Sequence, residues 1–125
     1  MKYLTIDDVI RLHKKLISKF GGSYGIREVN LLNSSISSVF QTYDGVELYP
    51  SDLDKIIQAS YSLIENHCFI DGNKRIGTMV LLYLLKINCI DHSINNYDLI
   101  DIGLKVASGE MNKEDYKKYI ESKLK

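Results

Sequence analysis

Cysteine is scarce in this sequence, and no apolar run is long enough to cross a bilayer. The chain of 125 residues holds two cysteines, Cys68 and Cys89. A domain of this size buries a core without disulfides or metals, so two thiols indicate a reducing compartment. The longest apolar run, Met79 to Leu85, is far shorter than the roughly 20 residues that a membrane-spanning helix needs. Membrane association is therefore not expected.

Net charge is also absent, because the 16 lysines and arginines equal the 16 aspartates and glutamates. Proteins that bind duplexes rely on a basic surface that displaces counterions, so the composition argues against direct nucleic-acid binding. Residues 1–8 carry acidic groups where a secretory signal needs an apolar run. Together these absences predict a cytoplasmic protein.

What the sequence does contain is typical of one helical domain. Its apolar content of 45% and charged content of 26% are ordinary, and it has no repeat, low-complexity segment or linker. We therefore expect residues 1–125 to form a single domain. Apolar residues at helical spacing predict a first helix that begins after Thr5 and ends at Gly21-Gly22. A second, weaker helix is expected at about 28–39.

A short β-hairpin is predicted next. Its residues are Thr42, Tyr43, Asp44, Gly45, Val46 and Glu47. The central dipeptide, Asp44-Gly45, suits a two-residue hairpin turn. An isolated hairpin is only marginally stable, so we expect this one to lie against a helical body as a mobile flap.

The rest of the chain predicts four more helices. Ser51 begins the first of them, which we expect to run to His67. The helix predicted from Asn73 onward is apolar on nearly every side and should be central. Two further helices, each opened by an asparagine, are expected at about 96–107 and about 113–123. The predicted fold class is an all-α, compact domain of five to seven helices with one short hairpin flap.

Polar groups concentrate just before the central helix. The segment reads His67-Cys68-Phe69-Ile70-Asp71-Gly72-Asn73-Lys74-Arg75. The turn Asp71-Gly72-Asn73 tolerates positive φ. Such a turn leading into a helix points unpaired N–H groups outward at the positive end of the helix dipole, which makes an anion site. Lys74 and Arg75 oppose the dipole there, and a bound phosphate would remove this conflict.

Two further side chains suit a phosphate site. Asp71 is close enough to hold a Mg²⁺ ion that bridges phosphates. His67 lies on the other side of the loop, and an imidazole, with an ordinary pKa of about 6.5, suits a base that accepts a hydroxyl proton. Phe69 is interpreted as an inward anchor. Each of these residues alone more often serves structure, and His13 and His92 are interpreted in that way.

The motif resembles the signature of the Fic/Doc superfamily, and Lys74 resembles its death-on-curing (Doc) branch. The resemblance extends to Phe20-Gly21-Gly22, Gly25-Ile26-Arg27, Leu48-Tyr49-Pro50 and Ala107-Ser108-Gly109-Glu110. It implies an all-α Fic fold with the motif loop between two central helices. It also implies that His67 is the general base and that Asp71 coordinates Mg²⁺ or positions the substrate.

The same resemblance implies roles for the remaining residues. The candidate catalytic residues are His67, Asp71 and Arg75. Contacts to the phosphates of ATP would come from Gly72, Asn73, Lys74 and Arg75. The hairpin Thr42–Glu47 would be the flap that aligns the backbone of the target protein.

An activity is implied by two departures from the commoner Fic pattern. Typical Fic enzymes transfer AMP and carry a glycine where this chain has Lys74 and a second arginine where it has Thr78. Both departures match Doc-type proteins, which are toxins of toxin–antitoxin pairs and are associated with phosphorylation of elongation factor Tu and inhibition of translation. Because Lys74 adds bulk and charge where glycine leaves the backbone open, the nucleotide would bind reversed and present its γ-phosphate to the hydroxyl.

The sequence also bears on how the activity would be restrained and on which other functions the motif could serve. No self-inhibitory Ser/Thr-x-x-x-Glu-Gly/Asn segment is present, so restraint would come from a separate antitoxin. The alternatives are an AMP transferase and a catalytically silent module that binds a partner. A further alternative is a zinc protein in which His67 and Cys68 join Cys89 and His92 as ligands, although adjacent ligands make an awkward tetrahedral pair.

Overall fold

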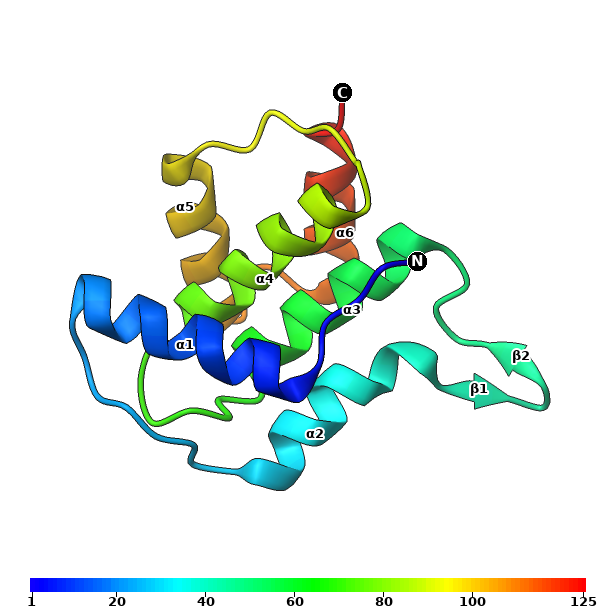
Figure 1. The fold of residues 1–125 in the computed structure, drawn as a ribbon. Helices are drawn as coiled ribbons and strands as arrows, with labels where there is room; N and C mark the ends of the chain where they lie inside the picture. Colours follow the sequence, from blue (N-terminus) through cyan, green and yellow to red (C-terminus); the bar gives the residue numbers. More distant parts are fainter.

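The computed structural model describes residues 1–125 and contains six α-helices, one 3₁₀ turn and one two-stranded hairpin (Figure 1). The helices are α1 (Ile6–Phe20), α2 (Val29–Ser37), α3 (Asp52–Glu65), α4 (Asn73–Ile87), α5 (Asn96–Ala107) and α6 (Lys113–Ser122). The 3₁₀ turn η1 (Ser38–Phe40) follows α2, and the strands are β1 (Thr42–Tyr43) and β2 (Val46–Glu47). The all-α class is confirmed. None of the six helices combines the length and apolar character needed to cross a bilayer.

Most of the helices begin where a capping side chain stands in the sequence. Thr5, Ser51, Asn95 and Asn112 each accept a hydrogen bond from the backbone N–H three residues further on. In α1, α5 and α6 the aspartate at that position also accepts from the capping residue's N–H, which completes a capping box. Because these signals are local, the predicted bounds 96–107 agree with the observed α5.

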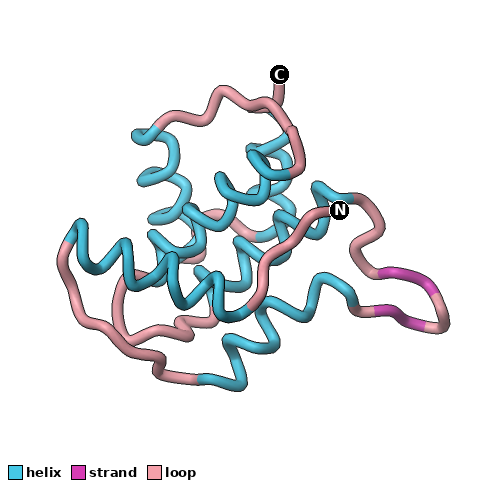
Figure 2. The backbone as a smooth tube through the Cα atoms, viewed as in Figure 1, coloured by secondary structure: helices cyan, strands magenta, loops and turns pink.

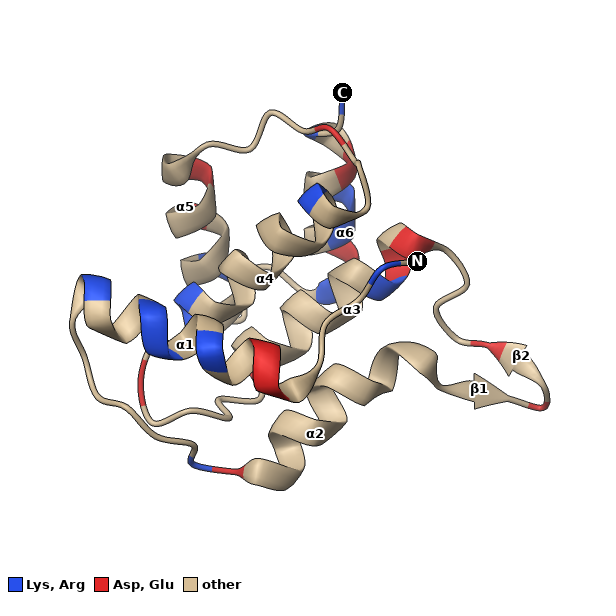
Figure 3. Ribbon diagram, in the orientation of Figure 1, with Lys and Arg blue, Asp and Glu red and all other residues tan.

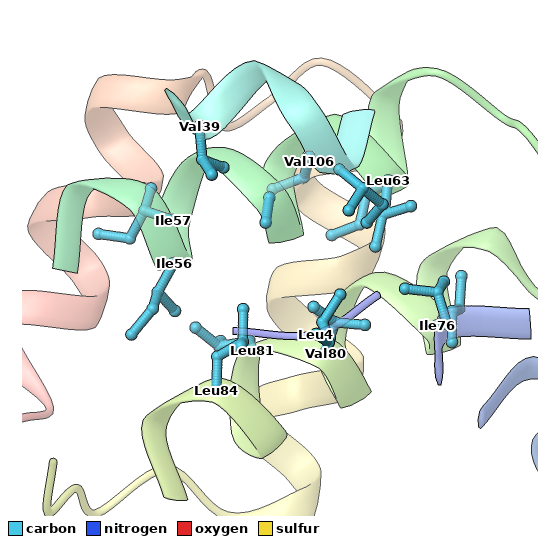
Figure 4. Close-up of a cluster of buried hydrophobic side chains, with 14 of the residues drawn as sticks. Leu4, Val39, Ile56, Ile57, Leu63, Ile76, Val80, Leu81, Leu84 and Val106 are labelled. Carbon is cyan, nitrogen blue, oxygen red and sulfur yellow. The ribbon is translucent and has the colours of Figure 1, made fainter. Parts of the chain in front are cut away.

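Helices α3 and α4 form the centre of the molecule. These two helices make the most extensive contact between any two elements. Helices α1 and α5 pack on α4, and helices α2 and α6 pack on α3 (Figure 2). Figure 4 shows the apolar core that these helices enclose, with side chains from α3 and α4 meeting those of Leu4, Val39 and Val106. The prediction of a central helix from Asn73 onward is confirmed.

Gly77 allows α3 and α4 to approach closely. A Cβ atom at this position would lie 2.3 Å from Cγ1 of Ile64 and 3.0 Å from the carbonyl oxygen of Ser60. The Ser60 hydroxyl donates to the Gly77 carbonyl at 2.7 Å and lies 2.7 Å from the hydroxyl of the fully buried Tyr116 in α6. This contact fixes α4, and therefore its N-terminus, against the rest of the domain.

The hairpin forms as predicted but does not lie against the helical body. Asp44 and Gly45 both have positive φ, at 52° and 76°, as a type I′ turn requires. Tyr43 and Val46 are 78% and 67% exposed, and the hairpin projects from the helices (Figures 1 and 2). It is held at its base, where the buried Lys55 of α3 donates to the Tyr49 carbonyl and pairs with Glu47 at 3.1 Å.

Candidate functional site

A cleft of about 380 Å³ lies at the N-terminus of α4. Seven motif residues line it: His67, Ile70, Asp71, Gly72, Asn73, Lys74 and Arg75. Leu16 and Ile17 of α1 form the facing wall. The hairpin contributes no residue to this cleft. A smaller cleft of about 200 Å³ lies beside the hairpin base, where Tyr49 meets Lys113, and contains none of the motif residues.

The first turn of α4 leaves its backbone donors free. Gly72 is the N-cap with φ 77° and ψ 20°, and no side chain caps the helix. Because the first bond inside the helix runs from the Ile76 N–H to the Gly72 carbonyl at 2.9 Å, the N–H groups of residues 73–75 have no partner within the helix. No acidic residue stands in this turn, and Lys74 and Arg75 are exposed. Free amides at a helix N-terminus favour an anion.

The carboxylate of Asp71 is oriented by backbone donors from two segments. One oxygen accepts from the Gly72 N–H at 2.8 Å, and the other accepts from the Ser23 N–H at 3.1 Å. A Cβ atom at Gly22 would lie 2.6 Å from this second oxygen, so a glycine is needed there. Each oxygen retains further acceptor capacity. Asp71 therefore fits one ligand position of a Mg²⁺ ion whose other ligands are phosphate and water oxygens.

The side chain of His67 lines the cleft, and hydrogen bonds from Arg27 fix its backbone. The residue has a positive φ of 47°, which is uncommon outside glycine. Arg27 donates from Nε and Nη2 to the His67 carbonyl at 2.9 and 2.7 Å, and its backbone N–H donates to the Cys68 carbonyl at 2.7 Å. The imidazole is exposed. The left-handed backbone also explains why α3 ends at Glu65 and not at His67 as predicted.

Asn73 reaches the site through its backbone, because its side chain is already engaged. Its Oδ1 accepts from the Phe69 N–H at 2.9 Å, and its Nδ2 donates to the Phe69 carbonyl at 3.0 Å. Phe69 itself is 2% exposed, which confirms that it is an inward anchor. The side chain of Asn73 thus closes the motif loop, while its N–H group remains available to a ligand.

Arg75 rests on an aromatic ring at the edge of the cleft. Its guanidinium carbon lies 4.4 Å from the centroid of the Phe20 ring, and Lys19 Nζ lies 5.3 Å from the same centroid. Phe20 is 52% exposed. Figure 3 shows basic residues along α1, and Lys14 and Lys15 of this helix are exposed. The cleft therefore carries two cations, Lys74 and Arg75, although the chain has no net charge.

Position 78 presents no cation to the cleft. Thr78 is 7% exposed, and its hydroxyl donates to the carbonyls of Lys74 and Arg75 at 3.1 Å each. A Cβ atom at Gly103 of α5 would lie 3.5 Å from the Thr78 methyl and 3.6 Å from Cβ of Lys74. The first turn of α4 is thus packed against α5 on the side where a second arginine would stand.

Sequence reasoning missed the contribution of α1. His13, Leu16, Ile17 and Phe20 lie on one face of this helix, with the spacing i, i+3, i+4, i+7. That spacing indicated a core stripe, and Leu16 and Ile17 are indeed buried. The structure places the same stripe beside the motif loop, where His13 Nε2 lies 2.7 Å from the Asp71 carbonyl oxygen. The only signal in the sequence was a histidine within an apolar stripe.

The zinc alternative is wrong. Cys68 is buried with its sulfur 3.6 Å from the Ser35 hydroxyl, and burial raises the pKa of its thiol, which opposes metal binding by a thiolate. Cys89 is exposed, and His92 Nδ1 accepts from the Ile94 N–H at 3.0 Å. No three side chains among His, Cys, Asp and Glu are grouped so that they could hold a metal ion.

The fold and the cleft define a class of protein: a small helical domain with an uncapped central helix whose N-terminus faces an imidazole and a carboxylate. The chain belongs to the Fic/DOC family, whose sequence profile matches residues 3–85. It is similar to Toxin Doc of Mycolicibacterium smegmatis, with 33% identity over 87 residues, which is 70% of this chain and 65% of that protein. The match thus spans slightly less than two thirds of the relative's length. The resemblance seen in the motif is confirmed.

Proposed function

We propose that this protein is a Doc-like toxin of a toxin–antitoxin pair. With Mg²⁺ it transfers the γ-phosphate of ATP to a hydroxyl of a cytoplasmic protein, elongation factor Tu, and thereby inhibits translation. One observation carries the proposal: α4 begins without a capping side chain, with two cations in its first turn, at the cleft that His67 and Asp71 also line. The similarity to Toxin Doc supports the toxin assignment.

The N-terminus of α4 is suited to bind a polyphosphate. Lys74 and Arg75 are unfavourable beside the positive end of the helix dipole, and a phosphate group on the free N–H groups of the first turn would offset both charges. Arg75 is already at the edge of the cleft, on the Phe20 ring. A side-chain movement of Arg75 would therefore bring its guanidinium to a bound phosphate.

Asp71 would hold the metal that accompanies the nucleotide. Its carboxylate is fixed by the N–H groups of Ser23 and Gly72 and keeps lone pairs for a cation. A bound Mg²⁺ would neutralise charge on the phosphates as the transferred group departs. Because the aspartate is held before any ligand arrives, little ordering is left for the moment of binding.

His67 would act as the general base. Its imidazole would accept the proton of the target hydroxyl while the hydroxyl oxygen forms a bond to the γ-phosphorus. The bond from that phosphorus to the oxygen bridging to the β-phosphate breaks, and ADP leaves. The hold of Arg27 on the His67 carbonyl keeps the imidazole at the cleft during this step.

Positions 74 and 78 favour phosphate transfer over AMP transfer. The commoner Fic pattern has a glycine and a second arginine at these places, whereas this chain has the exposed Lys74 and the buried Thr78. The cleft therefore carries one arginine and a lysine near the turn. We infer that the nucleotide places its γ-phosphate, and not its α-phosphate, at the reacting hydroxyl. AMP transfer is the second candidate.

The hairpin is proposed to dock the target, and the antitoxin to act in trans. Both strands of the hairpin are exposed and have free edges that an extended segment of a target can join. The hairpin precedes α3 and the motif loop follows it, so about 21 Å of helix separates them. A folded target protein is large enough to contact the hairpin and the cleft together.

Mass spectrometry of a bacterial lysate treated with this protein and ATP–Mg²⁺ tests the proposal, with a His67→Ala variant as the control. The expected result is a phosphate on one hydroxyl of elongation factor Tu that the variant does not add. AMP in its place would contradict the reversed nucleotide. If no protein were modified and no thermal shift with ATP–Mg²⁺ were seen, a silent partner-binding module would be the better description.

A further inference from the structure

We infer that His13 is a positioning residue of the anion site. Its imidazole fixes the peptide between Asp71 and Gly72, and thereby sets the direction of the Asp71 carboxylate and of the turn that opens α4. The inference rests on the proposed function in one respect, because it takes a nucleotide polyphosphate to be the ligand of that site. It concerns a residue that lies in α1, far from the motif in the sequence.

The hydrogen bond of His13 places a hydrogen on its Nε2 atom. The side chain is 2% exposed, and its Nε2 lies 2.7 Å from the carbonyl oxygen of Asp71. A carbonyl oxygen can only accept, so Nε2 must carry the hydrogen and donate. The bond joins the middle of α1 directly to the backbone of the motif loop.

Because the peptide between Asp71 and Gly72 is planar, the hydrogen bond of His13 also sets the direction of the Gly72 N–H group. In a trans peptide the carbonyl and the following N–H point in opposite directions. With the Asp71 carbonyl turned toward His13, the Gly72 N–H is turned away from α1, and it donates to Oδ1 of Asp71 at 2.8 Å. The orientation of the peptide therefore decides where the carboxylate can sit.

Two further contacts show that His13 supports the loop at several points. Its ring stacks on Phe69, with centroids 3.8 Å apart and planes at 12°. A Cβ atom at Gly72 would lie 3.5 Å from His13 Nε2, so the turn passes directly over the imidazole. Phe69 is in turn held by Asn73. His13 thus contacts the loop at positions 69 and 71 and leaves little space for a side chain at position 72.

The donor and the ring of His13 can be separated by substitution. His13→Phe keeps a ring that stacks on Phe69 but removes the donor to Asp71. His13→Gln keeps a side-chain N–H at a similar reach but removes the stack. A residue that served packing alone would tolerate the first change better than the second in every measurement.

Isothermal titration calorimetry with ATP–Mg²⁺, combined with thermal unfolding, tests the inference. His13→Phe should raise the dissociation constant about tenfold or more, as expected for loss of a hydrogen bond that orients a charged group, and should unfold near the wild-type temperature. His13→Gln should bind within a few-fold of wild type and unfold at a lower temperature. His92→Phe, which is remote from the cleft, is the matched control and should bind normally.

Two results would overturn the inference: wild-type affinity in His13→Phe, or a folded His13→Gln variant that binds as poorly as His13→Phe. If wild-type protein bound no ATP–Mg²⁺, the proposed function would fail, and the nuclear magnetic resonance spectrum of the free protein would still decide the role of His13. The wild-type spectrum should show the proton on Nε2. His13→Phe should shift the Gly72 amide resonance well beyond the shift caused by His92→Phe, and an unmoved Gly72 amide overturns the inference.

Discussion

The beginning of α4 differs from the beginnings of α1, α5 and α6. Those three helices are closed by capping boxes, with acidic residues in the first turn. Helix α4 begins at Gly72 without a capping side chain and carries Lys74 and Arg75 in its first turn. At a capped end, side chains of the same protein bind the helix amides and compensate the helix dipole. At the α4 end the amides have no side-chain partner and the dipole has no acidic residue beside it. The comparison separates helix ends that stabilise the fold from the end that we propose to bind a phosphate.

The open end of α4 is nevertheless well supported. Asn73 makes two hydrogen bonds to the backbone of Phe69, and Arg27 holds the carbonyl of His67. At α1, α5 and α6 the chain uses side chains to occupy the helix amides. At α4 it uses side chains to hold the loop in front of them, so the amides stay free while the geometry is fixed.

The largest effect should come from the base beside the open end. His67→Ala should reduce transfer to the target by on the order of 10²–10⁴, because the hydroxyl loses its proton acceptor, and should leave the circular dichroism spectrum unchanged. A rate assay with labelled ATP measures this. His92→Ala is the control and should keep the wild-type rate. Unchanged turnover in His67→Ala would remove the imidazole from the mechanism.

The cations of the first turn come next. Arg75→Ala should raise the dissociation constant for ATP–Mg²⁺ by about 10- to 100-fold, since a charged hydrogen-bonding partner of the phosphates is lost. Calorimetry gives the value. Arg11→Ala is the matched control, because Arg11 pairs with Asp8 at the capped end of α1 and faces no ligand. Equal affinity in the two variants would show that the open and capped ends do not differ in binding.

A third prediction separates nucleotide binding from target docking. Replacing Asp44-Gly45 by Val-Val should disrupt the hairpin, because both positions need positive φ. Transfer to the target should fall on the order of tenfold as an orienting contact is lost, while the dissociation constant for ATP–Mg²⁺ stays unchanged. Paired rate and calorimetry measurements check this. A parallel loss of nucleotide affinity would contradict the separation of hairpin and cleft.

The smallest effect should appear at a capped end. Asn112→Ala should lower the free energy of unfolding by about 1 kcal/mol through loss of the α6 cap and leave nucleotide binding unchanged. Asn73→Ala removes two hydrogen bonds to the buried Phe69 and should cost about 1–3 kcal/mol and also weaken nucleotide binding. Urea unfolding and calorimetry of both variants make the comparison. Weaker binding in Asn112→Ala would contradict it.

Local signals explain which parts of the fold could be predicted from the sequence. Capping residues and apolar spacing act within a few residues, so the bounds of α5 and the turn at Asp44-Gly45 agree with expectation. The end of α3 differs from the prediction. The left-handed backbone of His67 ends the helix early, and its carbonyl is bound by Arg27, a residue 40 positions away. The position of the hairpin also differs, since nothing within Thr42–Glu47 specifies what it packs against.

The sequence by itself determined the motif and the family of the chain. The nine residues from His67 to Arg75 are contiguous, so they must meet at one helix end. Only the tertiary structure decided what supports that end: His13 under the Asp71 peptide, Phe20 under Arg75, and Arg27 behind His67. The physical reason is distance along the chain. These contacts join residues 40 to 58 positions apart, and such pairings follow from how the helices pack, which no local spacing encodes.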